Sequence, residues 1–180
     1  MERYASALAS IGTVRRFDYA YMRAQKRAPD RLPTLLATHR GELAALLADT
    51  AHQSGPVVLI GKSMGGRVGC HLSLDAPVAA VICLGYPLRG VGKAQSLRDG
   101  ALVALTVPAL FVQGTRDSLC PLDQLTAVRE RMTAPNSLHV VPSGDHSLLA
   151  TKTYLRESGT TQAQLEAEIL EKIRDFCGHL

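Results

Sequence analysis

The sequence predicts an α/β fold in which helices cover a mostly parallel sheet. Short apolar runs alternate with segments of helical periodicity, a pattern typical of parallel strands joined by helical crossovers. The apolar runs are continuous, which indicates strands buried on both faces. The chain has 180 residues, 46% of them hydrophobic and 20% charged, enough for one domain over residues 1–180. We therefore expect a three-layer sandwich with the sheet in the middle.

The first third of the chain is predicted to contain two helices with a strand and a loop between them. A helix is expected over residues 2–10, because apolar residues fall on one side of it and a glycine follows. Residues 13–20 are predicted to form a partly exposed strand. The basic segment that continues to Pro33 is predicted to be a loop, and leucines at helical spacing indicate a helix over residues 34–51.

The remaining two thirds alternate between strands and helices. Apolar runs predict strands over residues 56–61, 78–84, 109–113 and 138–141. Helical patterns predict helices over residues 65–74, 122–132 and 161–176, the last of them amphipathic. Residues 88–106 are predicted to be a connection with room for one helix. No repeat or linker divides the chain.

The composition excludes several classes of protein. No apolar run approaches the ~18 residues that a membrane span needs, and the charged N-terminus lacks an apolar signal region. We therefore expect a cytoplasmic protein with no membrane partner. The four cysteines lie far apart and form no C-x-x-C pair, so reduced thiols are expected, with neither a metal site nor a cofactor.

The net charge of +4 is unevenly distributed. Residues 1–31 hold seven Arg or Lys and three Asp or Glu, whereas residues 32–180 hold thirteen of each. A basic stripe of this kind could bind nucleic acid or an anionic substrate. Only Tyr19 and Tyr21 are interleaved with it, and no nucleic-acid-binding module is recognisable, so we predict a solvated loop and no nucleic-acid partner.

The strongest functional signal is a G-x-S-x-G motif, Gly61-Lys62-Ser63-Met64-Gly65. It directly follows a predicted strand and directly precedes a predicted helix, the context of a serine nucleophile elbow. Such a sharp turn holds the serine in a strained conformation, and we expect the glycines on either side to be required because the backbone comes too close for a Cβ. Ser63 is the predicted nucleophile.

The same stretch offers a competing interpretation as a phosphate-binding loop. Residues 55–63, GPVVLIGKS, end in G-K-S but place five residues between the two glycines, where that motif has four. The five residues are the apolar strand itself, which cannot wrap its N–H groups around a phosphate. We therefore do not predict nucleotide binding.

A serine nucleophile needs a base, and the base needs an acid to orient it. Asp117 follows the strand at 109–113 and His146 follows the strand at 138–141, so the order Ser, Asp, His is that of α/β hydrolases. Asp123 is a rival acid, and Asp145 is disfavoured because it adjoins the histidine. The other histidines are expected on helices (His39, His52 and His71), in a strand (His139) and in the tail (His179).

The chain resembles the α/β-hydrolase superfamily through GKSMGGR at 61–67, PALFVQGTRD at 108–117 and SGDH at 143–146. With FDYAYMRAQKRAPDRLP at 17–33 and CLGYPL at 83–88, it resembles the dienelactone-hydrolase-like branch, in particular α/β hydrolases of the testis-expressed-protein type. The resemblance implies that Ser63, Asp117 and His146 are nucleophile, acid and base. It also implies that the backbone N–H of Met64 is one oxyanion donor.

One family feature is absent from the sequence. Such proteins begin with further strands and an H-G-x-G-like turn that supplies a second oxyanion N–H, and no such turn occurs here. The resemblance thus implies an α/β-hydrolase fold lacking its N-terminal strands, with a gap between the strands at 13–20 and 56–61. We expect either that the natural product extends upstream of Met1, or that this chain is weakly active or inactive.

The predicted function is that of a serine hydrolase acting on an ester, thioester or related small-molecule acyl substrate. The alternative is a catalytically weak or silent interaction protein that keeps the same fold, because one fold hosts many functions. The oligomeric state and the identity of the substrate stay open at this point.

Overall fold

The computed structural model describes residues 2–26, 28–49, 55–90 and 96–180. The chain forms two compact units that divide after Pro56. Three of the sequence expectations lie partly or wholly outside the described residues: the end of the helix at 34–51, the place of His52, and the middle of the connection at 88–106. The two units are described separately below.

In its described residues, the unit before residue 57 contains three helices, α1 (Glu2–Leu8), α2 (Ala20–Arg23) and α3 (Leu32–Ala48). The buried side chains of α3 are Leu35, His39 and Leu43, which recur every four residues and so form one stripe. Pro33 lies in the first turn of this helix, where its missing N–H would have no helical partner. The predicted loop to Pro33 therefore includes α2 and the start of α3.

The strand predicted over residues 13–20 is wrong. Residues 13–19 have no regular structure and Ala20 begins α2. The aromatic residues of this segment instead contact α3: the ring centroids of Phe17 and His39 lie 4.9 Å apart, and the Tyr19 hydroxyl lies 3.1 Å from His39 Nδ1. Tyr19 is thus buried by side-chain packing and not by strand pairing, while Val14 stays exposed. The sheet gap expected beside this strand is therefore not found.

The unit after residue 56 is built on a four-stranded parallel sheet, which confirms the predicted fold class. The strands are β1 (Val58–Lys62), β2 (Ala80–Leu84), β3 (Ala109–Gly114) and β4 (Asn136–Val141), in the order β1-β2-β3-β4. Every residue of β2 and β3 is buried, as expected for central strands covered on both faces. The core of this unit lies on these two strands.

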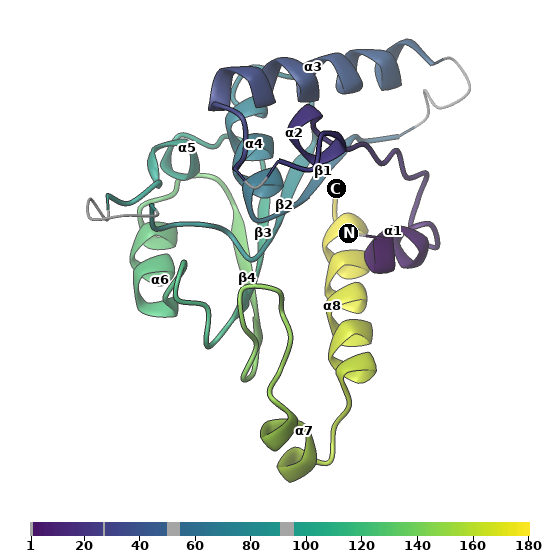
Figure 1. Ribbon diagram of the computed structural model, residues 1–180. Helices are drawn as coiled ribbons and strands as arrows, with labels where there is room; N and C mark the ends of the chain where they lie inside the picture. The colour runs from purple at the N-terminus through teal and green to yellow at the C-terminus, as the bar shows by residue number, and fades with distance from the viewer. Residues whose placement is uncertain (1, 27, 50–54, 91–95) are drawn as a thin grey trace. The chain divides into compact units, whose positions relative to one another are not determined.

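Helices cover both sides of this sheet (Figure 1). The crossovers contain α4 (Met64–Leu72), α5 (Gly100–Val103) and α6 (Leu122–Glu130), and α7 (Lys152–Ser158) precedes the terminal helix α8 (Gln162–Cys177). Figure 1 places α5 and α6 on one side of the strands and α8 on the other. The side chains that α8 buries are Leu165, Ile169 and Ile173, at helical spacing.

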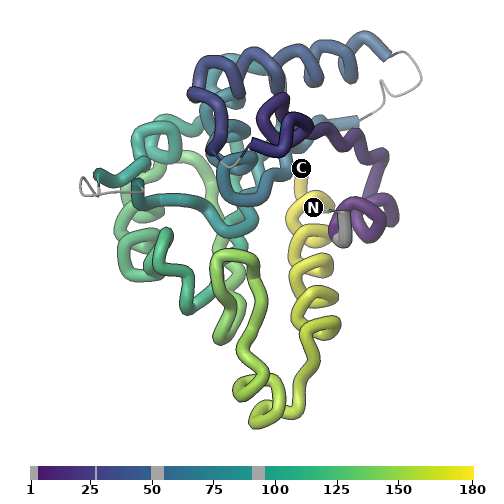
Figure 2. The backbone as a smooth tube through the Cα atoms, in the orientation of Figure 1, coloured from purple at the N-terminus to yellow at the C-terminus, as the bar shows by residue number. Residues whose placement is uncertain are grey.

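The path after β4 brings the chain back past the sheet before it enters the last helix. Figure 2 shows this path running from β4 through a loop to α7 and then along α8. The sequence did not predict α7, which has seven residues and no buried side chain. None of the helices in the described ranges is long and apolar enough to cross a membrane.

Candidate active site

Ser63 lies at the turn between β1 and α4, immediately before the first helical residue. Its backbone has φ 51° and ψ −118°, a region that a residue with a side chain rarely adopts. The backbone N–H of Ser63 donates to the Leu84 carbonyl at 2.9 Å, which ties the turn to the end of β2. A strained conformation of this kind costs about 1–3 kcal/mol and is commonly found at functional sites.

Close packing of the turn requires glycine at two positions, but only one of them is a glycine of the G-x-S-x-G motif. A Cβ on Gly61 would overlap the backbone of Gly65 and Gly66, and a Cβ on Gly66 would lie 2.9 Å from the Gly61 carbonyl oxygen. A Cβ on Gly65 would meet nothing within 4 Å. The expectation that Gly65 is sterically required is therefore wrong, and the constrained pair is Gly61 and Gly66.

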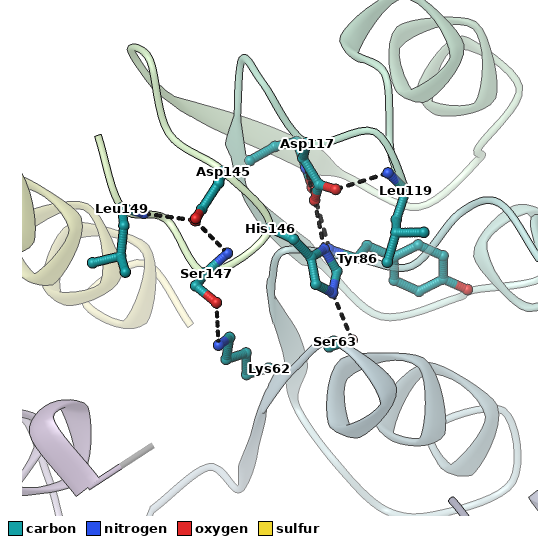
Figure 3. Close-up of polar contacts among 10 residues, drawn as sticks. Lys62, Ser63, Tyr86, Asp117, Leu119, Asp145, His146, Ser147 and Leu149 are labelled. Carbon is teal, nitrogen blue, oxygen red and sulfur yellow. Dashed lines mark hydrogen bonds and ion pairs between the residues drawn. The ribbon is translucent and has the colours of Figure 1, made fainter. Parts of the chain in front are cut away.

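The structure brings Ser63, His146 and Asp117 together in one chain of hydrogen bonds (Figure 3). His146 Nε2 lies 2.7 Å from Ser63 Oγ, and His146 Nδ1 lies 2.7 Å from Asp117 Oδ2. The carboxylate accepts the Nδ1–H, so Nε2 of the neutral ring is left to accept the serine proton. The side chain of Asp117 is 0% exposed, whereas that of His146 is 27% exposed. The acid is therefore shielded from solvent, while the base is accessible to it.

The carboxylate of Asp117 is held by two further donors. Gln113 Nε2 donates to Asp117 Oδ2 at 2.6 Å, and the backbone N–H of Leu119 donates to Oδ1 at 2.9 Å. Burial acts to raise the pKa of Asp117, but the hydrogen bonds from His146 and Gln113 and the attraction of His146 outweigh it, so the pKa is lowered. The carboxyl group therefore stays ionised and able to orient the imidazole.

Gln113 is a site residue that the sequence analysis missed. It is the last but one residue of the buried strand β3 and its side chain is fully buried. Its Oε1 accepts the backbone N–H of Tyr86 at 3.2 Å, and its amide group donates to Asp117. Both polar ends of the amide are thus used. A polar residue at the end of an otherwise apolar buried strand is the signal that could have pointed to it.

The base is carried by a tight loop after β4. Asp145 Oδ1 accepts the backbone N–H groups of Ser147 at 2.7 Å and Leu149 at 3.0 Å. This side chain therefore shapes the loop and does not contact the imidazole of its neighbour, as its position in sequence suggested. The other rival acid, Asp123, lies in the first turn of α6, and no contact with His146 is found for it.

Two glycines at the ends of strands give this loop room to approach the elbow. Gly85 follows β2 with φ +64°, and a Cβ there would lie 2.7 Å from the carbonyl oxygen of His146. A Cβ on Gly114, the last residue of β3, would overlap the backbone of Gly144. The carboxyl ends of the strands therefore accept the histidine loop only because they lack side chains at these points.

The backbone N–H of Met64 belongs to the first residue of α4, so it has no acceptor within the helix. Such groups carry the positive end of the helix dipole and stabilise negative charge nearby. Met64 directly follows Ser63, which places its N–H beside the serine. This position is compatible with the oxyanion role that the resemblance implied.

Three observations concern the residues that the sequence offered for other functions. No group of three or more His, Cys, Asp or Glu side chains that could hold a metal ion occurs among them. Residues 58–62 of the rival phosphate loop form β1, paired with β2. In the basic N-terminal segment, Arg15 pairs with Glu42 and Arg23 Nη1 donates to the Asp18 carbonyl.

Solved structures share this fold. The chain is 19% identical to a dienelactone hydrolase from Anabaena variabilis, with a TM-score of 0.68 over 99% of this chain and 78% of that chain. It is 20% identical to an alpha-beta serine hydrolase homologue from Coxiella burnetii, with a TM-score of 0.61 over 87% and 72%. The esterase domain of a Rhodothermus marinus protein is 17% identical, with a TM-score of 0.58 over 78% and 66%.

Two comparisons rest on sequence. The chain is 26% identical over 99 residues to Protein sumv-2 of Caenorhabditis elegans, a match that covers 55% of this chain and 9% of that protein. The chain thus spans only a small part of this relative. Residues 1–178 match the family model described as alpha/beta hydrolase domain, and the chain therefore belongs to the alpha/beta hydrolase domain family.

Proposed function

We propose that the protein is a serine hydrolase that cleaves an ester, thioester or related small-molecule acyl substrate through an acyl-enzyme. The observation that carries this proposal is the hydrogen-bond chain from Ser63 Oγ through His146 to Asp117, with both distances at 2.7 Å. In this arrangement the nucleophile, the base and the orienting acid each have a partner of the right chemical kind.

The first half of the reaction transfers the acyl group to the protein. Ser63 Oγ attacks the substrate carbonyl while His146 Nε2 takes the hydroxyl proton, and the Nδ1–H of the resulting imidazolium stays bonded to Asp117. The negative charge that develops on the carbonyl oxygen is stabilised by the backbone N–H of Met64. As the tetrahedral intermediate collapses, His146 returns the proton to the departing alcohol or thiol.

The second half releases the acyl group to water. His146 Nε2 takes a proton from the attacking water, whose oxygen bonds to the acyl carbon, and then gives that proton back to Ser63 Oγ. A carboxylic acid leaves and the free serine is restored. Asp117 stays ionised throughout, in accord with its lowered pKa.

The finer assignments belong to the same proposal. We place the chain in the dienelactone-hydrolase-like branch and, within it, with the testis-expressed-protein type, on the motifs at residues 17–33 and 83–88. We also propose a cytoplasmic location. The thiols of Cys70 and Cys83 are hydrogen-bonded at 3.5 Å and form no disulfide, as is usual for cysteines in a reducing compartment.

A fluorophosphonate probe tests the proposal directly, because it reacts covalently with an activated serine. We expect stoichiometric labelling of the wild-type chain and loss of labelling in Ser63→Ala. We expect His146→Ala to react more slowly by about 10³-fold or more. Hydrolysis of short-chain aryl esters and thioesters, followed in parallel, defines the acyl class.

The matched control is Ser137→Ala, which removes an exposed serine of β4. It should label like the wild type. If a folded wild-type sample is not labelled, or if Ser63→Ala is labelled equally well, the hydrolase proposal is rejected. Absence of labelling in folded protein would favour the silent interaction protein that the sequence left as an alternative.

A further inference from the structure

A second hydrogen bond joins the serine elbow to the histidine loop, beside the one between Ser63 and His146. Lys62 Nζ donates to Ser147 Oγ at 2.9 Å, although the two residues are 85 positions apart. Lys62 immediately precedes Ser63, and Ser147 immediately follows His146. Figure 3 shows that the Lys62–Ser147 bond and the Ser63–His146 bond both run from the elbow to the histidine loop.

We propose that Lys62 and Ser147 form a positioning clamp that holds the imidazole of His146 in register with Ser63. This inference rests on the proposed function, because it assigns a role in the same reaction. Neither side chain touches the reacting atoms in this role, so both are positioning residues. The hydrogen bond between Lys62 and Ser147 is drawn in Figure 3.

The topology explains why such a clamp is needed. The elbow follows β1 and the histidine loop follows β4, the two outer strands of the described sheet, with β2 and β3 between them. Neighbouring strands lie about 4.8 Å apart, so the two loops must meet across roughly 14 Å of sheet. β1 and β4 are linked only through the ladders of β2 and β3, so the fine placement of the two loops also depends on contacts beyond the ends of the strands.

The histidine loop is braced internally, which makes it move as one piece. Besides accepting two backbone N–H groups on its side chain, Asp145 donates its own N–H to the Leu149 carbonyl and accepts from Leu148 N on its carbonyl. The start of the loop is held to the segment after β3, because Arg116 N donates to the Gly144 carbonyl and Ser143 N donates to Thr115 Oγ1, both at 2.8 Å. Beyond this anchor, a loop that met the elbow only through Ser63 and His146 could still tilt about that bond. A second bond from the adjacent pair of residues removes this freedom.

The clamp also has a suitable chemical form. An ammonium donor makes a charge-assisted hydrogen bond, which is stronger than a bond between neutral groups. Lys62 is only partly exposed, as is Ser147, so water competes less for the bond than at an open surface. Because a misplacement of 1 Å can cost about 10²-fold in rate, a bond that fixes the 2.7 Å contact between Nε2 and Oγ has a catalytic effect.

The test is a double-mutant cycle on Lys62→Met and Ser147→Ala. We expect each single variant to lower kcat for an activated ester by about 5- to 30-fold with KM unchanged, and the double variant to be no worse than either, because all three lack the same bond. Ser147→Thr, which keeps the hydroxyl, should regain most of the lost rate. The pH midpoint of kcat/KM should not move in any of them.

Two matched controls remove the same chemical groups elsewhere: Lys152→Met at the start of α7 and Ser137→Ala on β4, both at exposed positions. Both should keep the wild-type kcat. Additive losses in the cycle would overturn the clamp. So would a loss confined to Lys62→Met together with a shifted pH midpoint, since that pattern means an electrostatic effect of the ammonium group.

Amide hydrogen exchange gives a readout that does not depend on turnover. We expect the amides of residues 143–149 to exchange several-fold faster in Lys62→Met and Ser147→Ala than in the wild type, and those of β2 and β3 to be unchanged. Unchanged exchange at 143–149 would refute the clamp. If exchange rises but wild-type Ser63 is not labelled by the probe, the clamp is upheld as a structural device and the hydrolase proposal fails separately.

Discussion

Among single residues, Gln113 makes the most consequential contacts outside the three that we assign to the reaction. Its amide fixes the carboxylate of Asp117 on one side and satisfies the backbone N–H of Tyr86 on the other. Tyr86 itself follows the glycine that makes room for the histidine loop. One buried side chain thus joins the ends of β2 and β3 to the acid.

We predict that Gln113→Leu lowers both stability and rate. The substitution leaves the buried Tyr86 N–H without its acceptor, which costs about 1–3 kcal/mol of unfolding free energy, and it removes one of the two donors to Asp117 Oδ2, leaving that oxygen with His146 alone. Because the carboxylate can then move, kcat should fall about tenfold. Urea unfolding and ester hydrolysis measure the two effects. Unchanged values for both would mean that Gln113 only fills space.

Gln113→Glu is the sharper variant because its effect depends on pH. As a neutral acid, Glu donates its O–H to Asp117 and accepts from Tyr86, so it replaces the amide. Once ionised, it repels the carboxylate of Asp117 at hydrogen-bond distance. We therefore expect activity relative to wild type to be highest at low pH and to fall as pH rises. A ratio of rates that does not vary with pH would contradict this account.

At the scale of elements, the turn from β1 to α4 offers two glycine-to-alanine substitutions four positions apart. We expect one to disrupt the turn and the other to be tolerated. Gly61→Ala places a Cβ within the backbone of the helix start, so we expect it to cost about 1–3 kcal/mol or more and to abolish probe labelling of Ser63. Gly65→Ala meets open space in a helix.

The Gly65→Ala variant serves as the control for Gly61→Ala, since both add one methyl group. We expect it to fold and label like the wild type, with a gain of up to about 1 kcal/mol because Ala favours a helix over Gly. Thermal unfolding and probe labelling check both variants. If Gly65→Ala loses labelling while it stays folded, the turn is more tightly constrained than its steric environment indicates.

The strands and the long helices were predictable because their signals are local. Apolar runs marked all four strands to within two residues at each end. The order of the motifs predicted that Ser63, Asp117 and His146 act together, and these three side chains form one hydrogen-bond chain. The segment at 13–20 was mispredicted because an apolar side chain such as Phe17 has the same pattern whether it packs in a sheet or against His39. The Lys62–Ser147 bond was missed because a pairing over 85 positions leaves no local pattern. Gln113 was missed although it is a polar residue in an otherwise apolar strand, because that signal does not name its partners.

At the scale of the whole molecule, the two units contain buried titratable groups of opposite kinds. In the unit before residue 57, burial lowers the pKa of His39 to about 4, against an opposing effect of Glu42. In the unit after residue 56, the pKa of the Asp117 carboxyl is lowered. Each group binds protons less readily in the folded chain than in the unfolded one, so both make folding sensitive to acid.

The two units should lose stability in acid through different groups, because the second unit also holds His71 and His139, whose pKa values burial lowers. The unfolded chain protonates His39 below about 6.5, whereas the folded unit resists until about 4, so the stability of the first unit should decline between these values. The slope is at most about 1.4 kcal/mol per pH unit. The stability that ionised Asp117 gives the second unit is present above its ordinary pKa and is lost only as pH falls through its lowered folded value.

Amide exchange followed by peptide at pH 7, 5.5 and 4.5, corrected for the intrinsic effect of pH, checks the role of His39. We expect protection of α3 to fall over this range. His39→Gln, which keeps a polar group for the Tyr19 hydroxyl but does not titrate, should flatten the response of α3. If α3 in His39→Gln loses protection with the same slope as the wild type, His39 does not determine the acid response of its unit.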